Sequence, residues 1–409
     1  MNSPQHGVSG RFHSLDAVRA SALLLGILVH ATQSFWPGFR ELNWPISDPS
    51  TSLTLSGTFF VLHIFRMSVF FAIAGFFAHA LLVRLGWWGL VRNRLRRIAL
   101  PLVVAMIVVM PLLILPFIWG QQQLGISGPP RMALPIPNPQ PPPWGHLWFL
   151  YLLLVLYALW MSARGLVAAV DRRGALASLG DRALRALVSN RLAVVALAAP
   201  TAIVLYYTPW WSMWPGIPTP LMGLVPNFPS VLAYGSAFAF GWFLHRQMSL
   251  LDSLKRDWLL NIAAAVVLSG LALWLIGAHP QLLAHDLPAV KRAVYSAAYV
   301  LAGWFWIFGL IGAAVRFLHA ESPRWRYLAD ASFFIYIVHL PIVYALQAWM
   351  LRWPLHWSMK FPIIVILTML IVLPLYHYGV RSTFVGRFLN GRKYPRGPML
   401  TSAPNTSPG

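Results

Sequence analysis

Ten long apolar segments recur along the chain, and they constrain the fold more than any other feature of the sequence. A helix needs about 20 predominantly apolar residues to cross a bilayer, and lipid offers the backbone no hydrogen-bond partner, which favours helices. Only 10% of the residues are charged, whereas a soluble domain carries about 25%. We therefore predict an all-α integral membrane protein with about ten transmembrane helices, at roughly 15–36, 57–82, 98–119, 146–162, 191–208, 228–246, 258–278, 293–315, 331–351 and 361–379.

The basic residues predict how these helices are oriented. The chain has 31 Lys and Arg residues against 10 acidic residues. Cytoplasmic loops of membrane proteins are the ones that retain Lys and Arg, and most basic residues fall there if the N-terminus is cytoplasmic. We therefore predict that both termini are cytoplasmic and that the excess charge orients the protein rather than binding nucleic acid. The outer loops then hold only Arg40, Arg131, Lys291, Arg292, Arg352 and Lys360.

The rest of the composition limits the domain organisation. The chain contains no cysteine, which excludes disulfides, a thiolate nucleophile and cysteine-ligated metals. No repeat or soluble domain interrupts the apolar segments, so we predict one polytopic domain at 1–397 and a disordered polar tail at 398–409. The segment 163–190 is the longest cytoplasmic loop and has an amphipathic pattern. Both a helix on the membrane surface and a solvated loop are compatible with this pattern.

The first apolar segment carries a polar stripe. Arg19 and His30 are very nearly three helical turns apart, so both side chains leave the same face, about 16 Å from each other along the axis. Asp16 lies one turn before Arg19 and can pair with it. An arginine near a helix end often serves only as an anchor, whereas an ionisable residue deep within a span indicates function. His30 is therefore the stronger candidate for catalysis.

The second apolar segment brings two further groups to a similar depth. His63 and Arg66 are one turn apart on one helix face. A buried arginine needs an anion or strong acceptors, and most of the 10 acidic residues lie in loops. Two interpretations remain open: Arg66 binds an anionic ligand, or it binds backbone carbonyl groups and ties helices together. Gly75, further along, allows another backbone or a ligand to approach closely.

The ninth segment adds a third polar set. Ser332, Tyr336 and His339 are spaced i, i+4, i+7 and share a helix face. This face forms either a second wall of a membrane cavity or a polar structural seam. Asp330 is well placed to cap the start of this helix.

The outer start of the fourth segment supplies two more candidates, His146 and Trp148. They either lie at the membrane interface or contact an acceptor outside the membrane. No group of His and carboxylate residues has the spacing of a zinc site, and we predict no metal.

Intramembrane His and Arg residues suit an enzyme and also a proton-coupled transporter or flippase. Against a transporter, the sequence shows no inverted repeat of broken helices, and its membrane centre lacks Asp and Glu. A structural or sensory membrane protein would leave the polar stripe of the first segment unexplained.

Six stretches of the sequence carry a resemblance to a known family. They are LDAVRA…H, HIFRMSVFFAIAGFF, RNRLRRIALP, HLWFL, RYLADASFFIYIVHLP and VRSTFVGRFLNGRKYP, in this order between Arg11 and Pro395. Together they resemble the acyltransferase-3 superfamily, and within it most closely the branch of membrane succinyltransferases that modify osmoregulated periplasmic glucans. The resemblance implies a multi-pass enzyme of the bacterial inner membrane that transfers an acyl group from cytoplasmic acyl-CoA to a sugar hydroxyl outside.

The resemblance also implies roles for several candidate residues. Arg19 and His30 match the essential pair of the superfamily, and the tyrosine–histidine element of the ninth segment matches as well. Ala74, Gly75 and Phe76 match a Ser-Gly-Phe element in which alanine replaces the serine, so no serine hydroxyl can be assigned a role there.

We combine these observations into one hypothesis. Basic residues of the RNRLRR stretch attract the phosphates of acyl-CoA, and the pantetheine arm passes Arg19, which Asp16 supports. His30 is the general base on a glucan hydroxyl, and Arg66 or His63 holds the oxyanion or the carboxylate of a succinyl group. We assign His30, Arg19 and Asp16 to catalysis, His146 and Trp148 to the acceptor, and the donor to His63, Arg66, Gly75, Arg94, Arg97, Ser332, Tyr336 and His339.

The hypothesis also specifies the partners of the protein. Acyl-CoA, with succinyl-CoA expected, is the donor substrate, and no bound cofactor is needed. The other partners are membrane lipid and a periplasmic glucan. Acetylation of another envelope glycan is the alternative, and the oligomeric state stays open.

Overall fold

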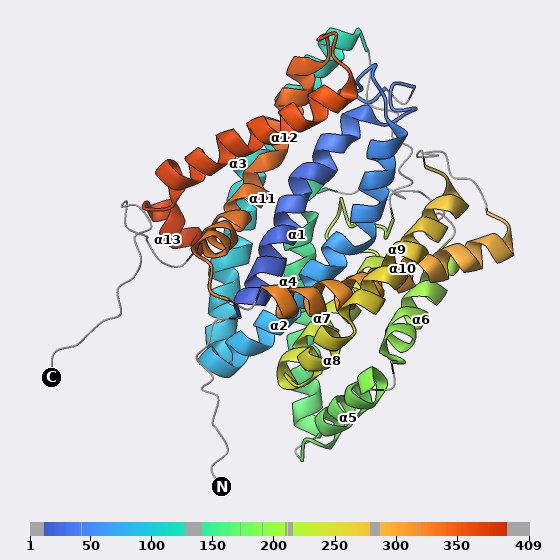
Figure 1. Ribbon diagram of the computed structural model, residues 1–409. Coiled ribbons are helices and arrows are strands. Elements are labelled where there is room, and N and C mark those ends of the chain that lie inside the picture. Colours follow the sequence, from blue (N-terminus) through green and yellow to red (C-terminus); the bar gives the residue numbers. More distant parts are fainter. Residues whose placement is uncertain are drawn as a thin grey trace.

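Helices make up almost the whole of the computed structural model (Figure 1). It describes residues 12–41, 43–126, 141–171, 173–189, 191–208, 211, 216–278, 287–318 and 320–390, so the predicted tail at 398–409 lies outside the described residues. Within these ranges no strand forms, and the only extended pairing is an isolated bridge between Pro143 and Met222. The all-α prediction is therefore confirmed for this part of the chain.

Each of the ten predicted apolar segments coincides with a helix. Seven helical stretches of the described chain are long and apolar enough to cross a membrane, or eight if the bent pair Ala175–Ser189 and Ala193–Tyr206 is one span. The helical, multi-pass character of the fold agrees with the sequence, while ten crossings and cytoplasmic termini remain predictions. The α-helices are α1 (His13–Thr32), α2 (Leu53–Arg94), α3 (Leu100–Leu124), α4 (Trp148–Val170), α5 (Ala175–Ser189), α6 (Ala193–Tyr206), α7 (Phe228–Arg246), α8 (Leu250–Arg256), α9 (Trp258–Ile276), α10 (Ala289–Phe317), α11 (Pro323–Met350), α12 (Trp357–Pro374) and α13 (Phe384–Asn390). Short 3-10 turns adjoin them at Gln33–Phe35 and Gly145–Leu147, and π-helical segments at Leu95–Ala99 and Leu375–Val380.

The helices α2 and α3 form one continuous helical stretch, Leu53–Leu124, of 72 residues. This is far longer than the roughly 20 residues that one crossing needs. Gly86 interrupts α2 with a φ of 67°, a conformation that glycine adopts without strain. Figure 1 shows α2 descending from the end of α1, turning at the bottom, and α3 running back upward. The stretch therefore runs down and back up, with the basic residues at 92–97 near its turn, and two separate membrane crossings remain a prediction.

The helix α1 lies between two packed cores. It contacts α2 and α10 on one side and α11 and α12 on the other. Its residues Leu23 and Val29 belong to the core shared with α2, α4, α7 and α10. Ile27 and Ala31 belong to the core shared with α3, α11 and α12. Because it borders both cores, α1 brings side chains of α2 and α11 together.

Gly75 allows α2 and α7 to cross in backbone contact. A Cβ atom on Gly75 would collide with the carbonyl oxygen of Phe238, and one on Gly241 would collide with that of Ala72. Contacts of this kind let helices in lipid pack closely. Of the two partners predicted for Gly75, the structure therefore shows the backbone, and Gly75 is a packing residue at this crossing.

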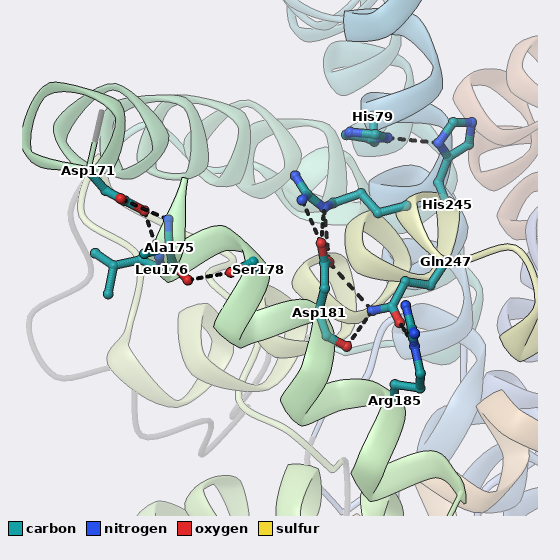
Figure 2. Close-up of polar contacts among 10 residues, drawn as sticks. His79, Asp171, Ala175, Leu176, Ser178, Asp181, Arg185, His245 and Gln247 are labelled. Atoms are coloured by element: carbon teal, nitrogen blue, oxygen red, sulfur yellow. Dashed lines mark hydrogen bonds and ion pairs between the residues drawn. The ribbon is translucent and has the colours of Figure 1, made fainter. Parts of the chain in front are cut away.

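The predicted loop at 163–190 contains the amphipathic helix α5. Figure 2 shows Asp181 of α5 reaching the end of α7, where its carboxylate pairs with Arg246 at 2.6 Å. Leu184 and Val188 are buried on the same helix. The solvated-loop interpretation is therefore wrong, because this segment docks on the bundle; its place on the membrane surface stays a prediction.

The helix α11 begins earlier than predicted. Its N-cap is Ser322, whose side chain accepts a hydrogen bond from the Trp325 amide at 3.5 Å, and Pro323 takes the first position, where its missing N–H does no harm. Asp330 lies inside the helix rather than at its cap. The prediction was wrong because Arg324 and Arg326 interrupt the apolar pattern in the first turn, so the apolar run starts later than the helix.

A buried ion pair joins the loop after α1 to the start of α12. Lys360 Nζ lies 2.7 Å from Asp48 Oδ2, and the two side chains are 1% and 3% exposed. Burial raises the pKa of Asp48, although hydrogen bonds from Lys360 and from the Ser50 amide oppose this shift. The loop between α1 and α2 is thereby fixed at the end of α1 that carries His30.

Candidate active site

The predicted ion pair forms near the beginning of α1. Arg19 Nη2 lies 2.9 Å from Asp16 Oδ1, and the Arg19 guanidinium lies 5.2 Å from the centre of the Phe77 ring. Asp16 is only 7% exposed. About three helical turns separate this pair from His30, so the two groups mark opposite parts of one helix face.

Three imidazole rings from three elements meet near the other end of α1. The ring centres of His30 on α1 and His339 on α11 are 5.3 Å apart. His146, in the 3-10 turn before α4, lies 5.8 Å from His339. His146 and His339 are buried. These three residues, termed here the imidazole cluster, are far apart in the sequence and are brought together only by packing around α1.

Hydrogen bonds hold the ring of His30 in place. Its Nδ1 donates to Gln33 Oε1 at 3.2 Å, and the hydroxyl of Tyr344 donates to the same oxygen at 2.9 Å. An amide oxygen only accepts, so Nδ1 carries the hydrogen and Nε2 of the uncharged ring has the lone pair. Gln347 donates to the carbonyl oxygens of His30 and Ala31, both at 3.0 Å, which satisfies groups that a helix end leaves open. His30 therefore presents a basic nitrogen from a fixed ring.

Arg66 lies beside the imidazole cluster without a counter-ion. Its side chain is 7% exposed, and among the described residues its guanidinium has neither an ion pair nor a hydrogen bond. A Cβ atom on Gly26 would lie 2.7 Å from Arg66 Nη1 and 3.5 Å from His339 Nε2. Because Gly26 has no side chain, the Arg66 guanidinium and the His339 ring can both approach α1 closely. Of the two interpretations of Arg66, the backbone-carbonyl contact finds no support in the described residues.

Tyr336 and Ser332 contribute to the site in different ways. The Tyr336 hydroxyl donates to the carbonyl oxygen of His146 at 2.6 Å, which fixes the turn before α4 against α11. The Ser332 hydroxyl donates to the Ala329 carbonyl of its own helix at 3.0 Å, so this hydroxyl is already used. Trp148 is buried against Tyr234, with ring centres 5.5 Å apart, and it lies in the interior of the bundle.

Three further predicted donor residues also lie outside the imidazole cluster. His63 stacks on Phe59 with ring centres 4.8 Å apart. The Arg94 guanidinium lies 5.0 Å from the centre of the Tyr157 ring. Arg94 and Arg97 adjoin the turn between α2 and α3, which Figure 1 shows at the opposite end of the bundle from the end of α1. These two arginines can contact only a part of a donor that is remote from His30.

Four residues that the sequence analysis did not single out shape the site: Gly26, Gln33, Tyr344 and Gln347. Gln33 follows His30 by one turn, a spacing that was visible in the sequence. Tyr344 and Gln347 lie on α11, and only the packing of α11 on α1 reveals their contacts. The single signal for Gly26 was a glycine within an apolar helical segment, which often marks a close approach. Within the described residues, no three His, Asp or Glu side chains are grouped to hold a metal ion.

The fold and the site define a multi-pass membrane protein with a basic imidazole and an uncompensated cation in its interior. The comparison with known proteins is more specific: the chain belongs to the acyltransferase-3 family, whose acyltransferase domain matches residues 12–377. The family membership that the resemblance predicted is thereby confirmed.

Curated relatives of the chain carry the name glucans biosynthesis protein C. The protein from Escherichia coli O6:K15:H31 (strain 536 / UPEC) is 35% identical over 164 residues, which cover 38% of this chain and 40% of that protein. The one from Escherichia coli O139:H28 (strain E24377A / ETEC) is 27% identical over 350 residues, which cover 81% of this chain and 82% of that protein. No solved structure matches the chain.

Proposed function

We propose that this protein transfers a succinyl group from cytoplasmic succinyl-CoA to a hydroxyl group of a periplasmic glucan, across the bacterial inner membrane. The observation that carries the proposal is the buried guanidinium of Arg66, which has no counter-ion among the described residues and lies beside the imidazole cluster. The family supplies acyl transfer, and the similarity to glucans biosynthesis protein C supplies the glucan. Succinyl is the acyl group because its free carboxylate provides the anion that a buried arginine requires.

His30 is the general base in this mechanism. With its Nδ1–H held by Gln33, Nε2 accepts the proton of a glucan hydroxyl, and the sugar oxygen attacks the thioester carbonyl carbon. The tetrahedral oxyanion then collapses, the C–S bond breaks, and the departing thiolate takes the proton from the imidazolium. One ester bond replaces one thioester bond, and His30 returns to its uncharged state.

The donor substrate extends along the polar face of α1. Arg94 and Arg97 attract the phosphates of CoA near the turn between α2 and α3, and the pantetheine arm continues past Arg19 toward His30. Arg19 and Asp16 are about three helical turns from His30. We therefore assign this ion pair to positioning of the donor, not to contact with the reacting atoms.

The exchange Arg66→Gln tests the choice of acyl group. Succinyl transfer should fall by about 10- to 100-fold, because a hydrogen bond to a charged group contributes about 1.5–3 kcal/mol. Acetyl transfer should fall clearly less, because acetyl has no carboxylate to lose. The measurement is kcat/KM of the purified protein in detergent with succinyl-CoA or acetyl-CoA and a glucan oligosaccharide, from released CoA thiol and the mass of the glucan.

The matched control is Arg352→Gln, because among the described residues this exposed arginine donates only to the Gln123 carbonyl, at 3.2 Å. This variant should leave kcat/KM unchanged with both succinyl-CoA and acetyl-CoA. Equal losses for both donors in Arg66→Gln would contradict a carboxylate contact and assign Arg66 to the oxyanion. Undiminished acylation by a folded His30→Ala protein would exclude His30 as the general base. Movement of a substrate across the membrane without formation of a new ester would exclude acyl transfer as the activity.

A further inference from the structure

Two buried imidazole nitrogens of the cluster have no hydrogen-bond partner among the described residues: His339 Nε2 and His146 Nδ1. The side chains are 1% and 7% exposed, and their rings are nearly perpendicular, at 89°, with centres 5.8 Å apart. Buried polar atoms without partners are rare in folded proteins, and each calls for an explanation. Two of them on adjacent rings, next to the proposed base, indicate that a ligand completes their hydrogen bonding.

The other nitrogen of each ring shows which kind of ligand is needed. His339 Nδ1 lies 3.1 Å from the Ile335 carbonyl oxygen and 2.8 Å from that of Tyr336. His146 Nε2 lies 3.1 Å from the Ile337 carbonyl oxygen. A carbonyl oxygen only accepts, so each of these nitrogens carries the hydrogen, and the remaining nitrogen of an uncharged ring has a lone pair. Both free nitrogens are therefore acceptors, and the ligand must donate to them.

The reacting end of the acyl donor cannot satisfy these nitrogens. A thioester carbonyl, a sulfur atom and a carboxylate are acceptors, whereas a sugar offers several hydroxyl donors. We propose that His339 Nε2 and His146 Nδ1 form the acceptor subsite, in which each binds one hydroxyl of the same sugar unit and thereby presents a neighbouring hydroxyl to His30. This assignment rests on the proposed function, and it moves His339 from the donor side to the acceptor side of the site.

The surroundings of the two rings support a preformed subsite. The Tyr336 hydroxyl donates to the His146 carbonyl at 2.6 Å and so fixes the two elements that carry the rings. On the side of α1, a Cβ atom placed on Gly26 would lie 2.7 Å from Arg66 Nη1 and 3.5 Å from His339 Nε2, so these two groups approach the same position. The cation that suits an anionic acyl group and the acceptors that suit a sugar therefore adjoin, as a transfer between two substrates requires.

Amide replacements separate the free nitrogen of each ring from the anchored one. The amide of Asn reaches the Nδ1 position of histidine, and the amide of Gln reaches the Nε2 position. His339→Asn thus keeps the anchor and removes the free acceptor, whereas His339→Gln does the opposite. For His146 the assignment is reversed, so His146→Gln keeps the anchor and His146→Asn keeps the acceptor. The four variants form a crossed set in which each pair controls for loss of the ring.

The readout is steady-state transfer from succinyl-CoA to a linear glucan oligosaccharide by the purified full-length protein. His339→Asn and His146→Gln should raise KM for the glucan about tenfold or more, with KM for succinyl-CoA changed less than about twofold. His339→Gln and His146→Asn should stay closer to the unmodified protein. If His339→Gln and His146→Asn instead raise KM for the glucan more, the anchored nitrogens matter and the free ones do not. If the variants raise KM for succinyl-CoA, the rings lie on the donor side. Either result overturns the subsite.

A second measurement on the unmodified protein covers the case in which variants fail to fold. Monodeoxy analogues of methyl glucoside, used as acceptors, each remove one hydroxyl. Two analogues should lose about tenfold in kcat/KM while still accepting succinyl at the remaining positions. If no analogue shows such a loss although succinyl transfer to the parent sugar is intact, the subsite is refuted and the proposed function stands. Absence of transfer to any glucan refutes the proposed function itself.

Discussion

At the scale of single residues, His30, His339 and His146 meet near one end of α1, and the guanidinium of Arg66 lies beside them. The pair of Arg19 with an acid one turn earlier was predicted and forms. Helical rise also predicted that His30 and Arg66 lie at a similar depth; His30 belongs to the imidazole cluster and Arg66 lies beside it. The meeting of His30 with His339 and His146 could not be derived from spacing, because spacing does not say which helix packs against which. His146 was assigned to the interface or an acceptor, and it is buried beside His339.

Gly26 offers a test at the scale of one methyl group. In Gly26→Ala the new Cβ atom would lie 2.7 Å from Arg66 Nη1, a distance that forces the flexible guanidinium to move. We expect the protein to fold and kcat/KM for succinyl transfer to fall about tenfold or more. The reason is that moving a substrate-binding group by about 1 Å can lower the rate about 100-fold. The measurement pairs succinyl-transfer kinetics with the thermal unfolding midpoint in detergent.

The matched control for this exchange is Gly270→Ala on α9. A Cβ atom on Gly270 meets no atom within 4 Å, and the position is exposed. This variant should retain full activity, and alanine should if anything stabilise the helix. Full activity of Gly26→Ala would show that the position of Arg66 is unimportant, and it would remove the support that this contact gives to the proposed site.

At the scale of elements, apolar length predicts where helices form but not how they end. The second segment was predicted to end near residue 82, and the first part of α2 runs on only to the break at Gly86, beyond which a second helical part reaches Arg94. The start of α11 was missed because Arg324 and Arg326 interrupt the apolar pattern in its first turn. Nor did any pattern predict the pair of Asp48 with Lys360, because Asp48 lies in the loop after α1 and meets the first turn of α12 only once the helices have packed.

The Asp48–Lys360 pair predicts a strong effect of single exchanges on stability. Lys360→Met should lower the free energy of unfolding by about 3–5 kcal/mol, because removing one partner leaves the other charge buried alone. The double exchange Asp48→Asn with Lys360→Met should recover most of this loss, since no buried charge remains. Chemical or thermal unfolding in detergent measures both. A single variant as stable as the unmodified protein would mean that the pair is not buried as the structure shows.

The same pair predicts a dependence on pH. Burial raises the pKa of Asp48, so the contribution of this carboxyl to stability is fully present below its pKa in the unfolded chain, about 3.9. It is lost as the pH rises through the folded-state pKa. Without Lys360, only the Ser50 amide still offsets the burial of the carboxylate, so the defect of Lys360→Met should be largest at neutral pH and shrink on acidification through this window. A defect that grows on acidification would contradict this assignment.

At the scale of the whole molecule, composition and charge were sufficient for the membrane class, and the order of six motifs was sufficient for the family. The way the helices assemble was beyond reach, because lipid-facing and protein-facing residues are equally apolar and only small contacts such as the crossing at Gly75 distinguish them. The assembly is nonetheless what relates the two ends of the site. It separates the basic turn between α2 and α3 from the end of α1 that carries His30 (Figure 1).

The direction of acyl transfer follows from which of these ends faces the cytoplasm. Because the chain contains no cysteine, single cysteines introduced at exposed positions report topology without background. Thr51, before α2, and Lys255, in α8, are both exposed, and the distribution of basic residues predicts them on opposite sides. In spheroplasts, a membrane-impermeant maleimide should label Thr51→Cys directly and Lys255→Cys only after permeabilisation. Direct labelling of Lys255→Cys would put the basic turn outside, where no cytoplasmic acyl-CoA could reach it, and the proposed donor would have to be replaced by one available on the outer side.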